Sequence, residues 1–365
     1  MGMMGKYIYG VIDSGEAERF PLDGVVRFAA GVGKTAELPR GAADCEEAYT
    51  ISWCDVSAVV TDAPVVDYLS MPKDTLARLL VRHQQVIERV MARHTILPLK
   101  LGTCAESEEQ VRQILARGGG TIRDALEKAG GVVEVDVTAT IGDFNSFLRH
   151  VSQAAEIESL KQSLLHAQEK VTLEDQMKIG MLVERQANQE KRRMAAEIHA
   201  ALDPVAEGVK DHDLMDDRMV LNSAFLVRRD RQEEFDGHVE QLNAGFDDQL
   251  DFRRVGPLPP YSFYTLEVRV PDLEEVDWAL RQLGLSGDFI TVDAIKKAHR
   301  RLALTCHPDK NPGVPDIEKK FADMSRAYKL LLDYSRAFGR AEHDEGLPLD
   351  EAAFEKNAIL VTTLG

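Results

Sequence analysis

The first part of the chain alternates between strand-like and helix-like patterns of apolar and polar residues. Apolar residues occupy alternate positions in three stretches, which predicts strands over residues 6–13, 47–62 and 131–141. The second stretch is either two strands or one strand broken near Asp55. Apolar residues at helical spacing predict helices over 73–93, 106–117 and 121–129. This mixture indicates an α+β domain over residues 1–141.

The middle of the chain is helical at first and then returns to a strand period. Residues 171–202 lack proline, keep a helical pattern and stop before Pro204, which predicts one long helix. After this helix, strands are predicted over 220–227, 249–255 and 264–270, with a helix over 230–243. Such an order suits a ferredoxin-like sheet. We therefore expect a helical arm and a second α+β domain over residues 142–270.

The C-terminal part shows helical patterns and one loop. Helices are predicted over 276–285, 290–307 and 316–336, and the second has Thr291 or Asp293 available as its N-cap. The loop, HPDKNPGVPD, holds three prolines and one glycine, which excludes a continuous helix. Two amphipathic helices joined by such a loop form an antiparallel hairpin. We expect an all-α module over 275–340 and an acidic C-terminal tail over 341–365.

The composition is typical of a globular protein in a reducing compartment. Of the 365 residues, 44% are hydrophobic and 29% are charged, a balance that allows a real core. No apolar run is long enough to span a bilayer, and the first residues do not resemble a secretion signal. The cysteines lack CxxC spacing, so we expect reduced thiols in the cytoplasm and no zinc site at Cys45, Cys54, Cys104 and Cys306.

Charge is distributed unevenly along the chain. The net charge of −17 argues against a nucleic-acid partner. Residues 275–340 hold 12 Lys and Arg against 9 Asp and Glu, a local charge of +3, so the remainder carries −20. Four of these basic residues gather on the outer face of the predicted second helix: Lys296, Lys297, Arg300 and Arg301. A basic module attached to an acidic body indicates two parts with different roles.

Four short motifs follow one another in the C-terminal module. They are Leu283-Gly284-Leu285 at a helix end, KKAHRRLAL before the loop, HPDKNP within it and KKFADMSRAYKLL after it. In this order they strongly resemble the J-domain family of DnaK co-chaperones, over about 60 residues. His299 stands where the family usually has a tyrosine, and an acidic stretch replaces the glycine-rich region that follows in many members. The chain also lacks the cysteine-rich zinc module of general-purpose members.

This resemblance implies two contacts with a DnaK-class chaperone. The loop residues His307, Pro308 and Asp309 would trigger ATP hydrolysis in the partner. The four basic residues of the outer face would steer the module to an acidic patch on the chaperone. Asp309 can pair with an arginine of the partner, and Pro308 holds the geometry of the turn. The alternative for the basic face is that it is simply solvated.

Four blocks in the first 270 residues also occur in a characteristic order. They are KYIYG at the start, ISWCDVSAVVTDAP, a helix with His83 and Glu88 followed by ILPLKLGT, and GPLPPYSF over 256–263. Together they resemble the gas vesicle protein family GvpF/GvpL, whose last block usually reads G-P-x-P-P-Y-[SN]-F. Leu258 stands where an aromatic residue is common. The resemblance implies two α+β domains, in agreement with the periodicity.

The second resemblance implies an accessory role in building gas vesicles, which are hollow shells of a small hydrophobic subunit. The expected partners are this shell subunit, other gas vesicle accessory proteins and the DnaK-class chaperone, but no nucleic acid and no membrane. The expected location is the cytoplasm, at gas vesicles. We therefore expect an assembly co-chaperone whose body holds the subunit. The alternatives are a structural vesicle component or a general co-chaperone, with the J-domain only as a docking module.

Catalytic patterns are missing from the sequence. It shows no nucleophile elbow, triad or paired-carboxylate pattern. His83, His94 and His150 lack ligand spacing with carboxylates or cysteines, so core or surface roles are expected for them. We expect a protein that is not an enzyme, uses no metal or cofactor and stimulates the ATPase of its partner.

Overall fold

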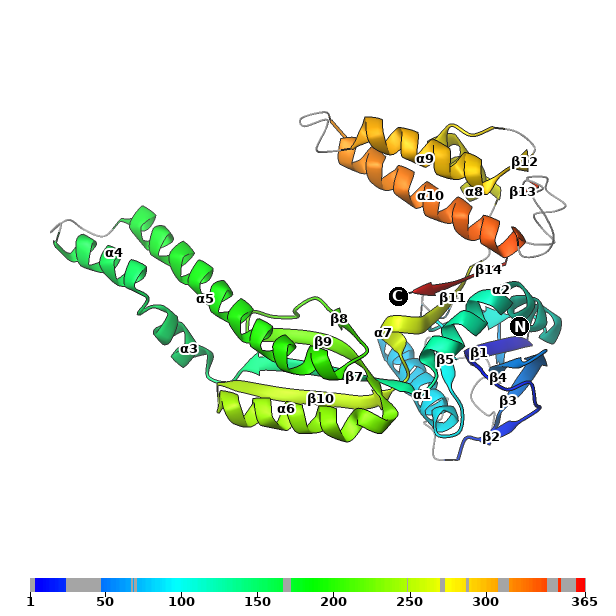
Figure 1. Cartoon of the computed structure of the whole chain (residues 1–365), viewed down its shortest axis with the longest axis horizontal. Helices are drawn as coiled ribbons and strands as arrows, with labels where there is room; N and C mark the ends of the chain where they lie inside the picture. Colours follow the sequence, from blue (N-terminus) through cyan, green and yellow to red (C-terminus); the bar gives the residue numbers. More distant parts are fainter. Residues whose placement is uncertain are drawn as a thin grey trace. The chain divides into compact units, whose positions relative to one another are not determined.

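The computed structural model describes residues 4–23, 47–66, 68, 71–166, 172–247, 249–269, 273–286, 289–307, 315–339, 347–348 and 359–364. Contacts divide the chain into two compact units, Met1–Gly130 with Tyr264–Gly365, and Gly131–Phe263. Both units combine helices and strands, which confirms the α+β class (Figure 1). None of the helices in the described ranges has the length and apolar character that crossing a bilayer requires.

The first unit is built on an antiparallel sheet with the strand order β2-β3-β4-β1-β5, and β6 also pairs with β1. The strands are β1 (Met4–Ile12), β2 (Arg19–Pro21), β3 (Glu47–Trp53), β4 (Val56–Pro64), β5 (Ile96–Pro98) and β6 (Cys104–Ala105). β3 and β4 form a hairpin that turns at Cys54 and Asp55, where Cys54 has a φ of 53°. Of the two alternatives for this stretch, two strands is the one observed.

Two helices, α1 (Lys73–Met91) and α2 (Glu108–Ala129), cover opposite faces of this sheet. Ile8 of β1 belongs to the core cluster that includes α2. The rings of Tyr7 and Tyr9, its neighbours on β1, instead contact the ring of His83 on α1. Successive side chains of a strand point to opposite faces. The alternation along β1 therefore creates one core on each side of the sheet.

α2 runs without a break through Gly118, Gly119 and Gly120, where the sequence predicted a gap between two helices. A glycine inside a helix costs about 0.5–1 kcal/mol relative to alanine. Close packing explains two of them, because a Cβ on Gly118 would lie 2.9 Å from Val361 and one on Gly119 would lie 3.1 Å from Trp53. The glycines let neighbouring elements approach the helix closely.

Two strands from distant parts of the sequence complete the first unit. β11 (Thr265–Arg269) pairs antiparallel with β14 (Leu360–Leu364) along its whole length. Leu266 also forms a parallel bridge with Leu99, which follows β5. Leu266 and Val361 both lie in the core cluster that includes α2.

This pairing differs from the arrangement expected along the sequence. The sequence analysis grouped 264–270 with the second domain and treated 341–365 as a tail, because a strand period does not reveal a partner far away in the chain. The division into folding parts over 1–141, 142–270, 275–340 and 341–365 stays a prediction.

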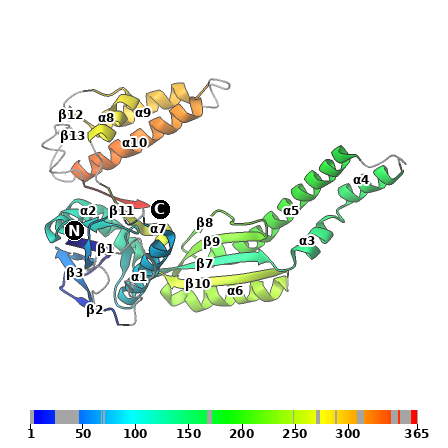
Figure 2. The same ribbon diagram turned by 180° about the vertical axis from the view of Figure 1, so that it is seen from behind.

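The second unit contains an antiparallel sheet with the order β10-β7-β9-β8. Its strands are β7 (Val132–Ile141), β8 (Gly208–Asp211), β9 (Met219–Arg228) and β10 (Leu250–Leu258). Its helices are α3 (Phe144–Val151), α4 (Ala155–His166), α5 (Leu173–Leu202) and α6 (Gln232–Phe246), with 3-10 turns at Asp203–Val205 and Arg229–Arg231. The crossovers through α5 and α6 give the βαββαβ order of a split βαβ motif. Figure 2 shows α6 running along β10, and one core cluster joins α5, α6 and the sheet.

Three helices follow β11 in the sequence: α8 (Leu273–Leu283), α9 (Val292–Cys306) and α10 (Ile317–Gly339). The short strands β12 (Phe289–Ile290) and β13 (Leu347–Pro348) pair antiparallel with each other. The three helices share a core cluster of their own. This arrangement confirms the helical module predicted from the sequence.

Candidate functional site

The candidate docking module is a helical hairpin with an independent core. Ile295 and Ala298 of α9 are buried in one cluster with Met324, Ala327 and Leu331 of α10. These positions recur at helical spacing on both helices, so each helix turns one apolar stripe inward. The opposite face of α9 is left for solvent and for partners.

Local signals in the sequence set the ends of the helices. Thr291 precedes α9, and its hydroxyl accepts a hydrogen bond from the backbone N–H of Ala294 at 3.2 Å, so Thr291 is the N-cap. Gly284 directly follows the last residue of α8 and has a φ of 62°. The N–H groups of Gly284 and Leu285 donate to the carbonyls of Arg281 and Leu280, at 3.1 and 2.9 Å. These two bonds form a Schellman motif, which explains why a glycine follows this helix.

His307 is fixed at the point where α9 gives way to the loop. It caps α9 with extended backbone, at a φ of −67° and a ψ of 130°. Its ring meets the ring of Phe321 on α10 edge-on, with centroids 5.3 Å apart. The hairpin thus holds the first residue of the expected tripeptide, whereas Pro308 and Asp309 lie outside the described residues.

The expected basic face is present on the outer side of α9. All four of its side chains are exposed: Lys296, Lys297, Arg300 and Arg301. Within the described ranges, none of them forms an ion pair with an acidic side chain of this chain. Arg326 of α10 contrasts with them, because it lies 3.3 Å from the Glu275 carboxylate and stacks over the ring of Trp278. In the described part of the chain, the charges of α9 therefore face solvent.

An apolar hollow of about 430 Å³ lies beside this face. It is lined by His299, Arg300, Ala303, Leu304 and His307. Leu304 is 65% exposed, which is high for a leucine. This hollow was not expected from the sequence. A signal was present, since Leu304 falls outside the buried stripe set by Ile295, Ala298 and Leu302.

His299, at the position where a tyrosine is usual, stacks on Tyr328 of α10. The two rings lie 3.9 Å apart at an interplanar angle of 15°. Burial lowers the pKa of His299, because the charged imidazolium loses hydration. The stack lets a histidine fill the place of an aromatic residue, so this departure leaves the hairpin intact.

Two of the sequence blocks from the first unit meet around His83. Burial lowers the pKa of this histidine to about 4, against the opposing effect of its hydrogen bond to the carbonyl of Leu99. Its other ring nitrogen, Nδ1, lies 2.9 Å from the Tyr7 hydroxyl, which also accepts the N–H of Gly102 at 3.2 Å. A neutral His83 therefore joins β1, α1 and the stretch after β5. The spacing of these residues in the sequence does not indicate that they are in contact.

The GPLPPYSF block has a similar role in the second unit. Ser262, in the short helix α7 (Tyr261–Tyr264), donates its N–H and hydroxyl to the Glu134 carboxylate at 2.7 and 2.9 Å. Burial raises the pKa of Glu134 to about 7, and burial also raises the pKa of the adjacent Asp136. No paired carboxylates were expected from the sequence. The structure brings Glu134 and Asp136 together, because residues two apart lie on the same face of strand β7.

The described residues hold no group of three or more His, Cys, Asp or Glu side chains arranged to bind a metal ion. Cys54, Cys104 and Cys306 are free thiols, and Cys45 lies outside the described residues. On one side, the hairpin of α9 and α10 presents positive charge, an apolar hollow and the ring of His307.

Two family models match this chain in separate regions. The model of the gas vesicle synthesis protein GvpL/GvpF matches residues 5–265, and the model of the DnaJ domain matches residues 281–338. Gas vesicle protein F2 of Halobacterium salinarum is 24% identical over 72% of this chain and 93% of its own length. Chaperone protein DnaJ of Ehrlichia ruminantium is 48% identical over 17% of this chain and 15% of its own length.

The fold is also similar to two crystal structures of gas vesicle protein GvpF. The protein from Anabaena aligns with a TM-score of 0.56 and 24% identity, covering 71% of this chain and 97% of that one. The protein from Microcystis aeruginosa aligns with a TM-score of 0.51 and 21% identity, covering 71% and 98%. The chain belongs to the gas vesicle synthesis protein GvpL/GvpF family, and it carries a DnaJ domain after the region that defines this family.

Proposed function

We propose that this protein is an assembly co-chaperone of gas vesicles. Its body binds the hydrophobic shell subunit, and its J-domain recruits a DnaK-class chaperone and stimulates that partner's ATPase. The chain itself catalyses no reaction and acts in the cytoplasm, at growing vesicles and beside other accessory proteins. One observation carries the proposal: a single chain joins the GvpL/GvpF fold to a J-domain whose basic face is exposed.

On the chaperone side, the roles divide between attraction and triggering. Lys296, Lys297, Arg300 and Arg301 attract the acidic surface of the chaperone and orient the first encounter. The exposed Leu304 beside them offers an apolar contact once the surfaces meet. His307, Pro308 and Asp309 then trigger ATP hydrolysis, with Asp309 accepting hydrogen bonds from the partner.

On the client side, the second unit offers an exposed apolar stripe on α5. Leu173, Met177 and Met181 recur every fourth residue and are 74%, 61% and 68% exposed. Side chains at this spacing lie on one face of a helix, and methionine adapts to irregular apolar partners. A stripe of this kind can shield a hydrophobic subunit, while the −20 charge outside the J-domain keeps the complex soluble.

The chaperone role is tested by the ATPase rate of a purified DnaK-class chaperone with and without this protein. His307→Gln should abolish the stimulation and leave the fold intact. His150→Gln is the matched control, because it makes the same change at an exposed position of α3. If the His307→Gln protein stimulates as well as wild type, the J-domain is only a docking module.

The client role is tested by co-purification of the shell subunit with the full chain. Met177→Lys together with Met181→Lys should reduce the amount of subunit captured. Gln176→Lys with Asn188→Lys adds the same charge at polar, exposed positions of the same helix and should not. Equal capture by both double variants would remove the α5 stripe from the proposal.

A further inference from the structure

β14 fills a site that other elements of the first unit build. The edge of β11 supplies pairing partners for every residue of β14. The facing wall is α2, where the absence of a side chain at Gly118 makes room for Val361. Val361 is 9% exposed. We call this edge of β11 and the α2 surface at Gly118 the β14 seat, and it recognises an extended backbone and one β-branched side chain.

The described side chains of β14 differ in how deeply the seat buries them. Val361 is buried, whereas Thr362, Thr363 and Leu364 are half-exposed. Among the strands that the structure describes, β14 pairs with β11 alone. An edge of this type pairs readily with an extended segment from another chain, because the backbone groups make no distinction between sequences. A competing strand would therefore need to pair with β11 and to place a β-branched side chain at the position of Val361.

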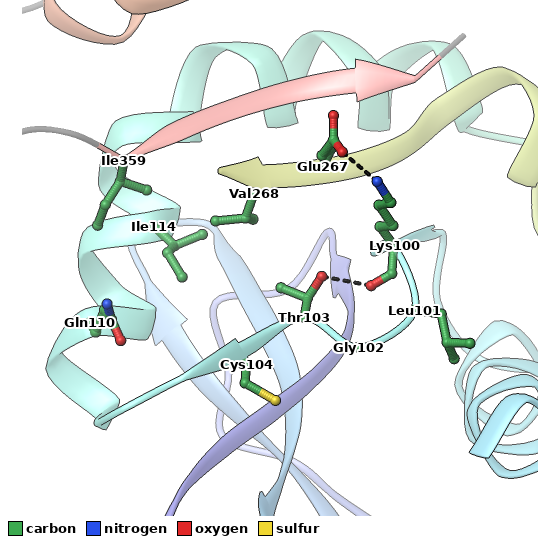
Figure 3. A pocket seen from close by; sticks show the side chains of 10 residues that line it. All are labelled: Lys100, Leu101, Gly102, Thr103, Cys104, Gln110, Ile114, Glu267, Val268 and Ile359. Carbon is green, nitrogen blue, oxygen red and sulfur yellow. Dashed lines mark hydrogen bonds and ion pairs between the residues drawn. The ribbon is translucent and has the colours of Figure 1, made fainter. Parts of the chain in front are cut away.

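A pocket of about 280 Å³ adjoins the seat where β14 begins (Figure 3). Ile359, the residue before β14, lines it together with Ile114 of α2 and the turn 100–104. An ion pair of 2.6 Å between Lys100 and Glu267 lies along its wall. A strand with a larger side chain in place of Ile359 would extend into this pocket. The pocket therefore gives the seat a second position at which it can discriminate between strands.

The seat and its occupant come from different parts of the chain. α2 and the turn 100–104 lie within the GvpL/GvpF match, which covers residues 5–265. β14 instead follows the DnaJ match at 281–338. A segment outside the family region therefore packs against a helix of that region, whereas its pairing strand β11 begins at the last matched residue, Thr265.

We propose that β14 is an exchangeable strand and that its seat binds an extended segment of a client protein. The segment that fits has a β-branched residue at the Val361 position and a second apolar residue at the Ile359 position, two residues earlier. Binding occurs by β-augmentation on β11, in place of β14. This site is separate from the exposed stripe on α5.

Exchange of β14 would also change how the J-domain is attached. The J-domain lies between β11 and β14 in the sequence, so both of its ends are fixed to this strand pair while β14 is seated. A client strand in the seat releases one of the two attachments and widens the range of orientations that the J-domain can take. This consequence rests on the proposed function, whereas the exchange itself does not.

A reversible lock on the full-length protein tests the exchange. Thr265 and Leu364 are paired across the two strands, so Thr265→Cys with Leu364→Cys should form a disulfide that holds β14 in place. The probe is a fluorescent peptide with the sequence of residues 357–365, NAILVTTLG. The reduced protein should bind this peptide at least about tenfold more tightly than the oxidised protein. A peptide with Val361→Asp should bind to neither form.

Two results would overturn the exchange. The first is that the locked and reduced forms bind the peptide equally well. The second is that neither the reduced form nor a chain shortened to end at residue 358 binds the peptide. Native mass spectrometry of the reduced protein adds a check. A dimer that exchanges β14 between copies would assign the seat to a second copy and not to a client. His307→Gln should leave peptide binding unchanged, so a failure of the chaperone role remains distinguishable.

Discussion

Arg269 and Leu360 are paired directly across β11 and β14, although the entire J-domain lies between them in the sequence. Residues that face each other at the end of an antiparallel pair can be joined by a turn of two residues. The J-domain therefore stands where a hairpin turn would be sufficient. Both of its connections to the body leave from the same end of one strand pair.

This arrangement predicts that the J-domain can be removed without damage to the body. Replacing residues 270–359 with Asn-Gly should close β11 and β14 into a hairpin, since this dipeptide favours the tight turn. Thermal unfolding by circular dichroism should then show a cooperative transition for the shortened protein, which should no longer stimulate the chaperone ATPase. Aggregation of this variant, when the full chain is soluble, would mean that the body needs the J-domain in order to fold.

Association with the chaperone should depend strongly on salt. The four basic residues of α9 are exposed, and charges of this kind are screened beyond about 8 Å at physiological ionic strength. Lys297→Glu with Arg300→Glu should lower the affinity about tenfold or more at low salt and flatten the salt dependence. Lys319→Glu with Lys320→Glu, the same change in charge on α10, is the control. Equal losses in both variants would point to net charge and not to the α9 face.

The second unit should lose stability as the pH rises through the range of Glu134. Burial raises the pKa of this side chain from 4.5 to about 7, so between these values the folded state keeps a proton that the unfolded state has lost. The free energy of unfolding should fall across this window by on the order of 3 kcal/mol. Urea unfolding at several pH values should show that Glu134→Gln removes most of this slope. An unchanged slope would mean that other groups cause it.

His83 should give the first unit the opposite dependence. Burial lowers its pKa from 6.5 to about 4, so between these values the unfolded state binds the extra proton. Stability should therefore be complete above pH 6.5 and should fall by on the order of 3 kcal/mol as the pH drops towards 4. Hydrogen exchange in peptides from β1 reports this loss. His83→Gln keeps an acceptor for the Tyr7 hydroxyl, and acid should then have little effect on these peptides.

The sequence predicted those features that depend on nearby residues. The helices of the J-domain follow from the spacing of Ile295, Ala298 and Leu302, and the end of α8 follows from Gly284. The exposed position of the four basic residues was readable in the same way. Each signal lies within one or two helical turns, where periodicity carries information.

The features that the sequence could not show are long-range contacts between polar or short elements. Glu134 meets Ser262, and Tyr7 meets His83, through backbone paths that no local pattern encodes. β14 is five residues long, and its partner lies beyond a complete domain. The predicted break in α2 was wrong. Glycine weakens an isolated helix, and the sequence did not show that β14 packs against α2 at Gly118.

The position of β14 has a consequence for the order in which the protein is made. A ribosome produces β1 early, and it produces β14 only after the entire J-domain has been translated. Domains generally fold as their segments emerge, but the last strand of the first unit does not yet exist at that stage. Every fully assembled copy of this body must therefore already carry a complete J-domain, and incomplete chains are left with an open edge on β11.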